Sequence, residues 1–349
     1  MHIDFSMLEV QGVLVVLLIS LTILAFGWPV GELLGAVDHP DNGRKTHARA
    51  TPLVGGIAIM VPLLIWAAAG IFWPDLIGGT PIPVALLVCG GGAALVGYFD
   101  DRSSVSPVAR LSLLLVLTVI ALRISPQLLP ARFHWSLLVS TPVAPWLAYV
   151  LVAIGMTGFV NAVNMADGQD GCAAGMFAIW SACIVWLGNG SADDVALVLF
   201  VTSLAVLAFN LRGKVFLGGA GAYGVTFVFG LLILYLHDAW GLTAEIVIVW
   251  LFLPIVDCLR LLVQRPLLGR SPFEPDRNHF HHRLHDRFGK HAGLGIYLGL
   301  VAASSFAVAF DRDLAPFCLV GLGCAYFGLM LLTMSATTAS APAKITRRD

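Results

Sequence analysis

The chain alternates between long apolar segments and short polar loops. A membrane-spanning helix needs about 20 mostly apolar residues, roughly 17–25, and a backbone inside lipid must satisfy its hydrogen bonds internally, which favours helices. Eleven segments fit this pattern, although several are short. We therefore predict an all-α polytopic membrane protein with a single domain over residues 1–333 and with spans near 11–30, 53–73, 81–98, 108–122, 145–160, 172–187, 194–210, 221–236, 243–263, 293–310 and 314–333.

The composition agrees with a membrane protein. Hydrophobic residues make up 58% of the 349 and charged residues 12%, with a mean hydropathy of +0.87, whereas a soluble domain carries about 25% charged residues. The run at 11–30 lacks a basic leading region and a cleavage site, so we expect a retained span rather than a signal peptide. The six cysteines lie in or beside apolar segments without a CxxC pair, which indicates neither a disulfide framework nor a cysteine-based metal site. We expect residues 334–349 to form a disordered cytoplasmic tail.

The positive charges fall almost entirely on one side of the predicted membrane. Seventeen of the 20 Lys and Arg residues lie in one set of loops, and the other set contains only Arg123, Arg132 and Arg312. Positive residues favour the cytoplasmic side. We therefore predict a periplasmic or extracellular N-terminus and a cytoplasmic C-terminus.

The first two polar clusters lie on this cytoplasmic side. The loop from Asp38 to His47 mixes Asp and His with Arg44 and Lys45, a set that could hold a diphosphate or form an ordinary positively charged loop. Asp100 and Asp101 are adjacent carboxylates at the end of a span. Such a pair can bind Mg²⁺ or act as a general base, and a solvated helix end is the alternative.

The third and fourth clusters combine polar side chains with glycines. In the run 161–171, amide and acid groups recur every three residues beside two glycines, which let a chain leave a helix and approach a ligand closely. Oxygen-rich groups of this kind suit a hard cation and a nucleotide, and a capped helix end is the alternative. The turn 216–221 could cradle phosphate on backbone N–H groups or pack small residues against a neighbouring helix. The recurring residues are Asn161, Asn164, Asp167 and Asp170.

The fifth cluster is rich in histidine. Four histidines fall within the seven residues from 279 to 285. No cysteine accompanies them, and the adjacent His281 and His282 of a helix should not both face one ion, so an anion clamp with Arg277 and Arg283 fits better than a zinc site. A basic loop against anionic lipid is the alternative. Asp257, near the end of a span, is costly unless it pairs, for example with Arg260, or serves a site.

Four of these stretches, in this order, resemble the polyprenyl-phosphate N-acetylhexosamine-1-phosphate transferase family, the MraY/WecA/TagO-like group of glycosyltransferase family 4. The resemblance covers most of the chain, from Asp38 to Leu284. Its last stretch is closer to the GlcNAc-1-phosphate branch than to the muramoyl-pentapeptide branch. The stretches are Gly97–Asp101, Asn161–Gly171, Phe216–Gly221 and Pro272–Leu284.

The resemblance implies that a polyprenyl (undecaprenyl) phosphate attacks the β-phosphorus of a UDP-sugar, giving a polyprenyl-diphosphate sugar and UMP. It implies Mg²⁺, with Mn²⁺ as an alternative ion, and a site on the cytoplasmic face of the bacterial inner membrane that feeds cell-wall or lipopolysaccharide synthesis. Both substrates are anionic, so a cation and basic groups are needed to offset their repulsion. The candidate residues are Asp100 and Asp101 for catalysis, Asn164 and Asp167 for the metal, and Lys45, Asn161, Asp170, Arg277, His279, His281, His282 and Arg283 for substrate binding.

One residue departs from the family pattern. Gly219 stands where the family's glycine-rich turn carries an Asp that contributes to the Mg²⁺ site. Three interpretations follow: other carboxylates compensate, metal use is altered, or the chain is a catalytically impaired member that acts as a binding or scaffold protein. The compensating carboxylates would be Asp100, Asp101, Asp167 or Asp257.

A secondary transporter is the rival outside this family. It would place ionisable residues in mid-span and show internal repeats, but the acidic groups here lie at span ends and no large repeat is found. The sequence indicates no nucleic-acid partner. It leaves open which UDP-sugar is used, which polysaccharide is served and whether the chain forms a homodimer.

Overall fold

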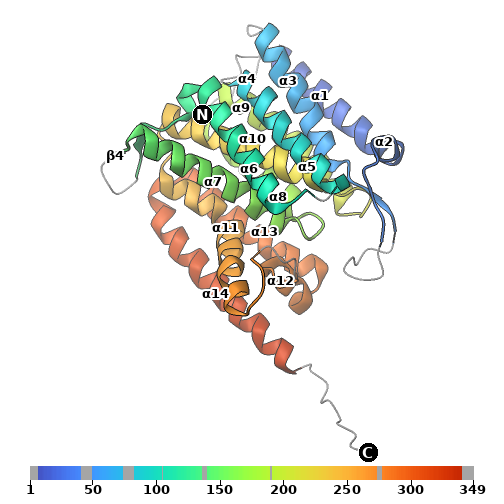
Figure 1. The fold of residues 1–349 in the computed structure, drawn as a ribbon, viewed down its shortest axis with the longest axis vertical. Helices are drawn as coiled ribbons and strands as arrows, with labels where there is room; N and C mark the ends of the chain where they lie inside the picture. Colours follow the sequence, from blue (N-terminus) through green and yellow to red (C-terminus); the bar gives the residue numbers. More distant parts are fainter. Residues whose placement is uncertain are drawn as a thin grey trace, which may run out of the picture.

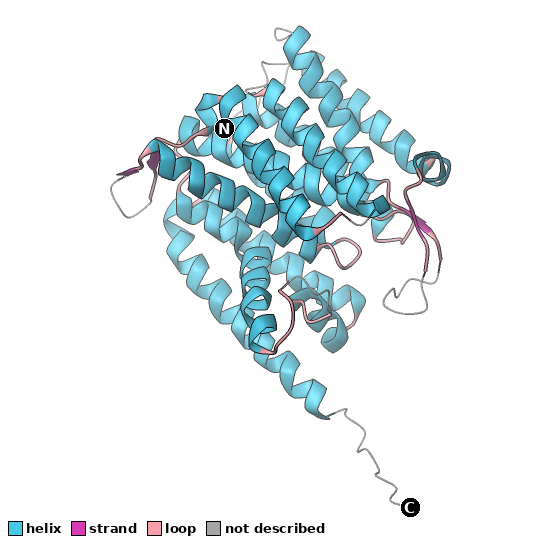
Figure 2. Ribbon diagram, in the orientation of Figure 1, coloured by secondary structure: helices cyan, strands magenta, loops and turns pink. Residues whose placement is uncertain are grey.

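The computed structural model describes residues 7–40, 49–73, 82–103, 105–135, 140–188, 191–272 and 277–339. Helices make up nearly all of this part, as Figures 1 and 2 show. Two antiparallel strand pairs interrupt them, β1 (Val37–Asp38) with β2 (Thr51–Pro52) and β3 (Arg132–Phe133) with β4 (Thr141–Pro142). The long helices are α1 (Met7–Ala25), α3 (Gly55–Phe72), α5 (Gly91–Ser103), α6 (Pro107–Ile124), α7 (Pro145–Ala166), α8 (Cys172–Leu187), α9 (Ser191–Asn210), α10 (Gly218–Trp240), α11 (Ala244–Leu267), α13 (Lys290–Phe310) and α14 (Ala315–Ala339).

Each of the eleven predicted segments contains a helix, which confirms the all-α polytopic membrane fold. Nine helices in the described part are long and apolar enough to cross a membrane. A tenth arises if α1 is counted together with α2 (Gly27–Leu34), although the two are bent by 76°. The helix α8 has 16 residues and falls short of a full span. The count of eleven and the orientation of the termini therefore stay predictions.

Several elements differ from the sequence-based expectation at their ends. The third span begins with α4 (Pro83–Ala85) and a π-helical turn (Leu86–Gly90) before α5. The histidine cluster forms a separate short helix, α12 (Phe280–Phe288). The helix α14 continues to Ala339, into the segment expected to be a tail, and residues 340–349 lie outside the described part.

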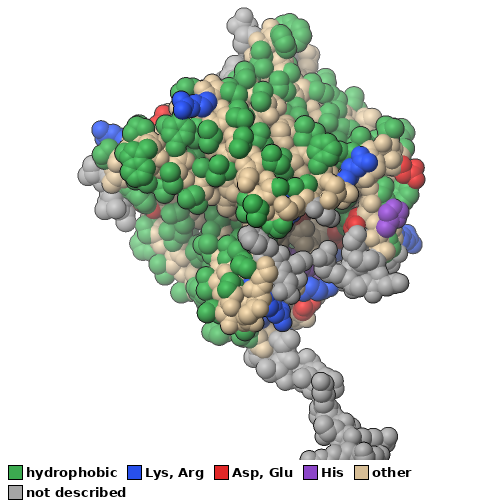
Figure 3. Space-filling model, viewed as in Figure 1, with side chains coloured by type: hydrophobic (Ala, Val, Ile, Leu, Met, Phe, Trp, Pro, Cys, Tyr) green, Lys and Arg blue, Asp and Glu red, His purple; other side chains and the backbone are tan. Residues whose placement is uncertain are grey.

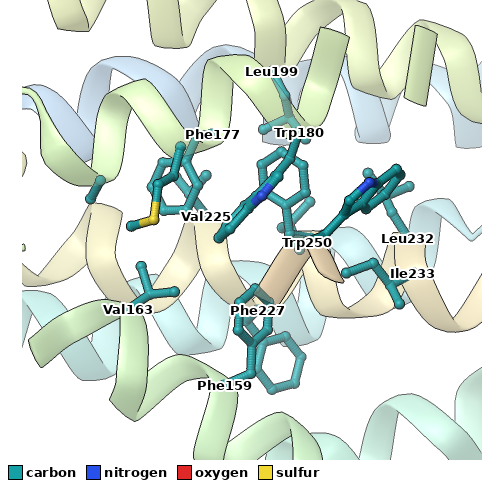
Figure 4. Close-up of a cluster of buried hydrophobic side chains, with 14 of the residues drawn as sticks. Phe159, Val163, Phe177, Trp180, Leu199, Val225, Phe227, Leu232, Ile233 and Trp250 are labelled. Atoms are coloured by element: carbon teal, nitrogen blue, oxygen red, sulfur yellow. The ribbon is translucent and has the colours of Figure 1, made fainter. Parts of the chain in front are cut away.

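The helix α10 lies at the centre of the bundle. It packs against α3, α5 and α7, as Figure 1 shows, and 89% of its most apolar stretch is buried. Aromatic side chains lie on both sides of it, and Figure 4 shows Phe177 and Trp180 of α8 on one side and Phe159 of α7 with Phe227 on the other. The rings of Phe177 and Phe229 stack with centroids 5.6 Å apart.

The outer surface is largely apolar. Figure 3 shows hydrophobic side chains over most of one face, with many of the visible charged and histidine side chains toward its lower and right edges. Large apolar side chains such as Val116, Phe317 and Leu331 are exposed on the outer helices. Exposed apolar helix faces suit contact with lipid, because lipid tails do not penalise them as water does.

Candidate functional site

Glycine contacts hold the start of α10 against two other helices. A Cβ atom on Gly97 of α5 or on Gly219 of α10 would overlap the backbone of the other residue, and Gly56 of α3 meets Gly221 in the same way. Small residues let helix backbones approach closely inside a membrane. The glycines of the turn at 216–221 thus pack helix against helix, one of the two interpretations that the sequence left open.

This packing places Asp101 on the first turn of α10. The N–H of Gly219 donates to Asp101 Oδ2 at 2.7 Å. Unpaired N–H groups and the helix dipole stabilise a negative charge at a helix N-terminus. A carboxylate from α5 therefore binds the N-terminus that the sequence offered to a phosphate.

The neighbouring Asp100 points to a different partner. Arg110 Nη1 donates to Asp100 Oδ2 at 2.5 Å, and the Tyr223 hydroxyl lies 3.5 Å from the same oxygen. Asn161 lines a small pocket together with Arg110 and Tyr223. The adjacent carboxylates thus have separate environments, one ion-paired and one at a helix end.

The loop after α7 carries the next group of predicted residues. The helix ends at Ala166, so the three-residue spacing runs past the helix and does not place all four polar groups on one helix face. Burial, followed by the negative charges of Asp101 and Asp170, raises the pKa of Asp167 well above its ordinary value. Asn164, one turn earlier, is partly exposed. Asp167 is therefore close enough to Asp101 for the two carboxylates to repel each other.

Residues 170 and 171 of this loop form an ion pair and a hydrogen bond with neighbouring helices. Asp170 forms an ion pair with Lys290 at the start of α13, with Oδ2 and Nζ 2.6 Å apart. The N–H of Gly171 donates to Asn210 Oδ1 at 2.5 Å, while Asn210 Nδ2 donates to the carbonyl of Val215 at 2.8 Å. The turn that leads into α10 and the loop after α7 are thus joined through one amide side chain.

Two histidines of α12 approach this loop directly. A Cβ atom on Gly168 would lie 2.6 Å from His281 Nε2 and 3.0 Å from His282 Nε2. Although His281 and His282 are adjacent in a helix, both rings reach the same loop residue from the first turn of α12. Glycine at 168 leaves the space that the two rings occupy.

The environment favours neutral rings at these two positions. Burial lowers the pKa of His281 well below its ordinary value, with further lowering by His282 and His279. The pKa of His282 is lowered to about 4, mainly by burial and then by the positive charge of Arg277. Neutral rings bind phosphate through hydrogen bonds rather than through charge, so a purely electrostatic clamp does not describe this pair.

The remaining predicted residues lie around the same helix. His279 Nδ1 lies 3.0 Å from Asp257 Oδ2, and Asp257 pairs with Arg260 at 2.7 Å, which confirms the expected pairing. Arg283 donates to Asn278 Oδ1, and the exposed Arg277, which precedes α12, lies 3.8 Å from Asp286 of that helix. Lys45 lies outside the described residues.

The structure therefore brings four of the five polar clusters together around the loop 167–171. Asp101 is within electrostatic reach of Asp167 in this loop, and the histidines contact Gly168. Sequence reasoning did not single out Arg110, Asn210 or Lys290. Each is a polar residue at the end of an apolar segment, and this position was the signal that could have identified it.

The fit of these residues to a metal ion is incomplete. In the part of the chain that the structure describes, no three His, Cys, Asp or Glu side chains gather closely enough to hold an ion. Mg²⁺ commonly binds through one or two carboxylates together with substrate phosphates, and Asp101 and Asp167 are two such carboxylates. The protein alone thus does not form a complete metal cage, and Gly219 adds no ligand.

Comparisons with known proteins show what the chain is similar to. The model of the family described as glycosyl transferase family 4 matches residues 83–237. The undecaprenyl-phosphate alpha-N-acetylglucosaminyl 1-phosphate transferase of Escherichia coli is 28% identical over 286 residues, 76% of this chain and 74% of that protein. The decaprenyl-phosphate N-acetylglucosaminephosphotransferase of Mycolicibacterium smegmatis is 28% identical over 342 residues, 83% and 80% of the two chains.

Fold, site and relatives together define an integral-membrane phosphotransferase, and the chain is an enzyme of this class. More narrowly, it is similar to glycosyl transferase family 4, whose model matches residues 83–237. The relatives of known name fall in the GlcNAc-1-phosphate branch, as the histidine stretch had indicated.

Proposed function

We propose that this protein transfers a sugar-1-phosphate, as N-acetylhexosamine-1-phosphate, from a UDP-sugar to polyprenyl phosphate, with polyprenyl-diphosphate sugar and UMP as products. The names of the relatives from Escherichia coli and Mycolicibacterium smegmatis support the lipid acceptor and the sugar class. The excess of basic residues in one set of loops supports a site on the cytoplasmic face of a bacterial inner membrane. The product would serve cell-wall or lipopolysaccharide synthesis.

One observation carries this proposal. The loop after α7 contacts the histidines of α12 at Gly168, and Asp167 in the same loop is close enough to Asp101 for the two carboxylates to repel each other. Three polar clusters far apart in the sequence thus meet at the ends of apolar helices. A lipid phosphate and a water-soluble nucleotide can meet only at such a boundary between lipid and water.

The reaction needs little covalent chemistry from the protein. A lipid phosphate oxygen forms a bond to the β-phosphorus, and the bond from this phosphorus to the bridging oxygen breaks, so that UMP leaves with the electron pair. A phosphate monoester is already largely dianionic at neutral pH because its second pKa is about 6. The protein therefore contributes mainly by holding two anions in line and by offsetting charge.

The residues of the site would contribute in different ways, according to the environment of each. Arg110 neutralises Asp100, so this pair adds no net charge beside the incoming phosphates. His281 and His282, as neutral rings, can donate or accept hydrogen bonds at Nε2, and His281 Nε2 is buried without a partner in the described part of the protein. A buried polar atom without a partner costs free energy, and a ligand oxygen at this position would remove that cost.

Mg²⁺, with Mn²⁺ as the alternative, is the ion that we propose for this site. Bound there, it would supply charge neutralisation for the two phosphates. Asn164 and Asp167 would hold it, and Asp101 is the further carboxylate within electrostatic reach of Asp167. Dependence of activity on added Mg²⁺ after treatment with a chelator tests this part.

A catalytically impaired protein is the second candidate, and Gly219 is the observation that favours it. Among the described residues, no group of three or more His, Cys, Asp or Glu side chains could hold a metal ion. Such a protein would bind UDP-sugar or lipid phosphate without forming product, and it would act as a binding or scaffold subunit.

Transfer of radiolabelled sugar into lipid, in washed membranes with Mg²⁺ and a panel of UDP-N-acetylhexosamines, tests the proposed function. We expect labelled lipid from at least one of these donors and none from membranes with Asp167→Asn. Binding of a UDP-sugar without labelled lipid would favour the impaired protein instead.

A further inference from the structure

Asp257 is a buried carboxylate in the C-terminal half of α11, and both of its oxygens accept hydrogen bonds. It is 5% exposed. Its Oδ1 accepts hydrogen bonds from Arg260 Nη2 at 2.7 Å and from the Tyr326 hydroxyl at 3.0 Å. Its Oδ2 accepts from the Phe280 N–H at 3.1 Å and lies 3.0 Å from His279 Nδ1. Four groups from three helices therefore converge on one side chain.

These contacts settle which ring nitrogen of His279 carries the proton. An ionised carboxylate only accepts hydrogen bonds, and its ion pair with Arg260 favours the ionised form. His279 Nδ1 must then be the donor, which leaves Nε2 as the ring nitrogen that faces away from Asp257. A hydrogen bond at one ring nitrogen commonly sets the role of the other.

The same carboxylate also fixes the place of the ring. His279 precedes the first residue of α12, and Oδ2 accepts the N–H of that residue, Phe280. A carboxylate at this position caps a helix and interacts favourably with its dipole. Asp257 thus holds both the start of α12 and the ring that stands there.

Arg260, which pairs with Asp257, also binds the backbone just before α12. Its Nη2 donates to the carbonyl of Asn278 at 2.6 Å, and its Nη1 donates to Gln264 at 2.8 Å. The ring of His279 then stacks on that of His281, with centroids 5.5 Å apart and planes 17° apart. The orientation set at Asp257 is therefore passed to the histidine that contacts Gly168.

We propose that Asp257 is a positioning residue of the transferase site: it keeps His279 in the tautomer with the proton on Nδ1 and so presents Nε2 toward the phosphates of the substrate. The inference rests on the proposed function for the substrate, but the tautomer is a property of the free protein. Among the described residues, the charged or titratable groups in contact with His279 are Asp257 of α11 and His281 and His282 of α12, and Arg260 of α11 and Tyr326 of α14 contact Asp257 behind it.

The first test measures the tautomer of the purified full-length chain by ¹⁵N NMR of its labelled histidines, with the His279 signal identified by its loss in His279→Gln. We expect wild-type His279 to be protonated at Nδ1. A ring protonated at Nε2 alone would overturn the proposal, whether or not the protein shows transferase activity.

The second test compares Asp257→Asn with Tyr326→Phe. The amide can present its NH₂ group to Nδ1, so we expect the tautomer to change and kcat to fall about 10- to 100-fold with a smaller change in KM, because a ring in the wrong tautomer loses function while the geometry persists. Tyr326→Phe removes one hydrogen bond to Asp257 but leaves its carboxylate intact. We expect kcat of this variant to stay within about threefold of the wild-type value. Wild-type kcat in a folded Asp257→Asn protein, or an equal loss in both variants, would contradict the proposal. If Asp257→Asn does not fold, the ¹⁵N NMR spectrum of the wild-type protein still tests the proposed tautomer of His279.

Discussion

Gly97 and Gly219 lie in direct backbone contact where α5 passes the start of α10. Neither residue has room for a Cβ atom, because it would overlap the backbone of the other. The sequence shows only that an acidic residue of the family is missing at 219. The structure adds that the backbone of α5 occupies the space that a side chain at position 219 of α10 would need.

The substitution Gly219→Asp should therefore not restore a stronger metal site. Its Cβ would overlap the carbonyl of Gly97 and lie 3.0 Å from Asp101 Oδ1, so the new side chain would both force the helices apart and repel a neighbouring carboxylate. Overpacking costs roughly 1–3 kcal/mol, occasionally more. We expect a lower apparent melting temperature and lower transfer activity than in the wild type.

Two alanine variants separate the causes of this loss. Gly219→Ala brings the same overlap without charge, and Gly299→Ala, on α13, meets no atom within 4 Å. We expect Gly219→Ala to be destabilised and Gly299→Ala to match the wild type or exceed it slightly. A large gain of turnover in Gly219→Asp would show instead that the helices adjust and that the wild type is impaired.

The substitution Gly168→Ala should impair substrate binding with little loss of stability. The new Cβ would lie 2.6 Å from His281 Nε2 and 3.0 Å from His282 Nε2, and both atoms are ends of side chains that can move away. We expect KM for the UDP-sugar to rise about tenfold, which corresponds to about 1.4 kcal/mol. Gly158→Ala, on α7 with no atom within 4 Å, is the matched control, and an equal KM in both variants would argue against a binding role for the histidine pair.

Arg110 and Asp100 should behave as a coupled pair. Removing one partner of a partly buried ion pair leaves an uncompensated charge, whereas removing both is less costly. We therefore expect Arg110→Met to lower stability more in the wild-type background than in the Asp100→Asn background. Thermal unfolding of the four proteins in a double-mutant cycle measures this coupling, and additive effects would show that the contact contributes nothing.

Acid should destabilise the protein through the histidines of α12. The pKa of His282 is lowered to about 4 and that of His281 is lowered as well, while an unfolded histidine titrates near 6.5. Between about pH 6.5 and 4 the unfolded chain binds more protons at these residues, so stability falls as the pH falls. The apparent melting temperature should drop over this window, and a double variant with His281→Gln and His282→Gln should drop less steeply. Equal slopes in the two proteins would contradict the assignment.

The sequence predicted the helices well because lipid imposes a strict length and a strict apolar composition on a span. The helix α8 has the predicted bounds, and with 16 residues its role as a span stays a prediction. The end of α14 differed, because small and polar residues extend that helix to Ala339. Local composition says little about where a helix ends when no Pro or Gly stops it.

The chemistry of the site was only partly predictable. Asp100 and Asp101 stand out as a charged pair at a span end, but their separation into an ion-paired and a helix-capping carboxylate depends on Arg110 and on Gly219, both in other helices. The contact of Gly168 with the histidines of α12 joins residues more than a hundred positions apart. No periodicity within one segment encodes such a contact.

The most direct measurement of the central claim is release of UMP by the purified protein, measured with UDP-N-acetylhexosamine in the presence and absence of polyprenyl phosphate. The account predicts UMP and polyprenyl-diphosphate sugar in equal amounts, formed only when the lipid phosphate is present and abolished in Asp167→Asn. Folded wild-type protein that binds the sugar nucleotide but releases no UMP with any donor, lipid and divalent ion would contradict it.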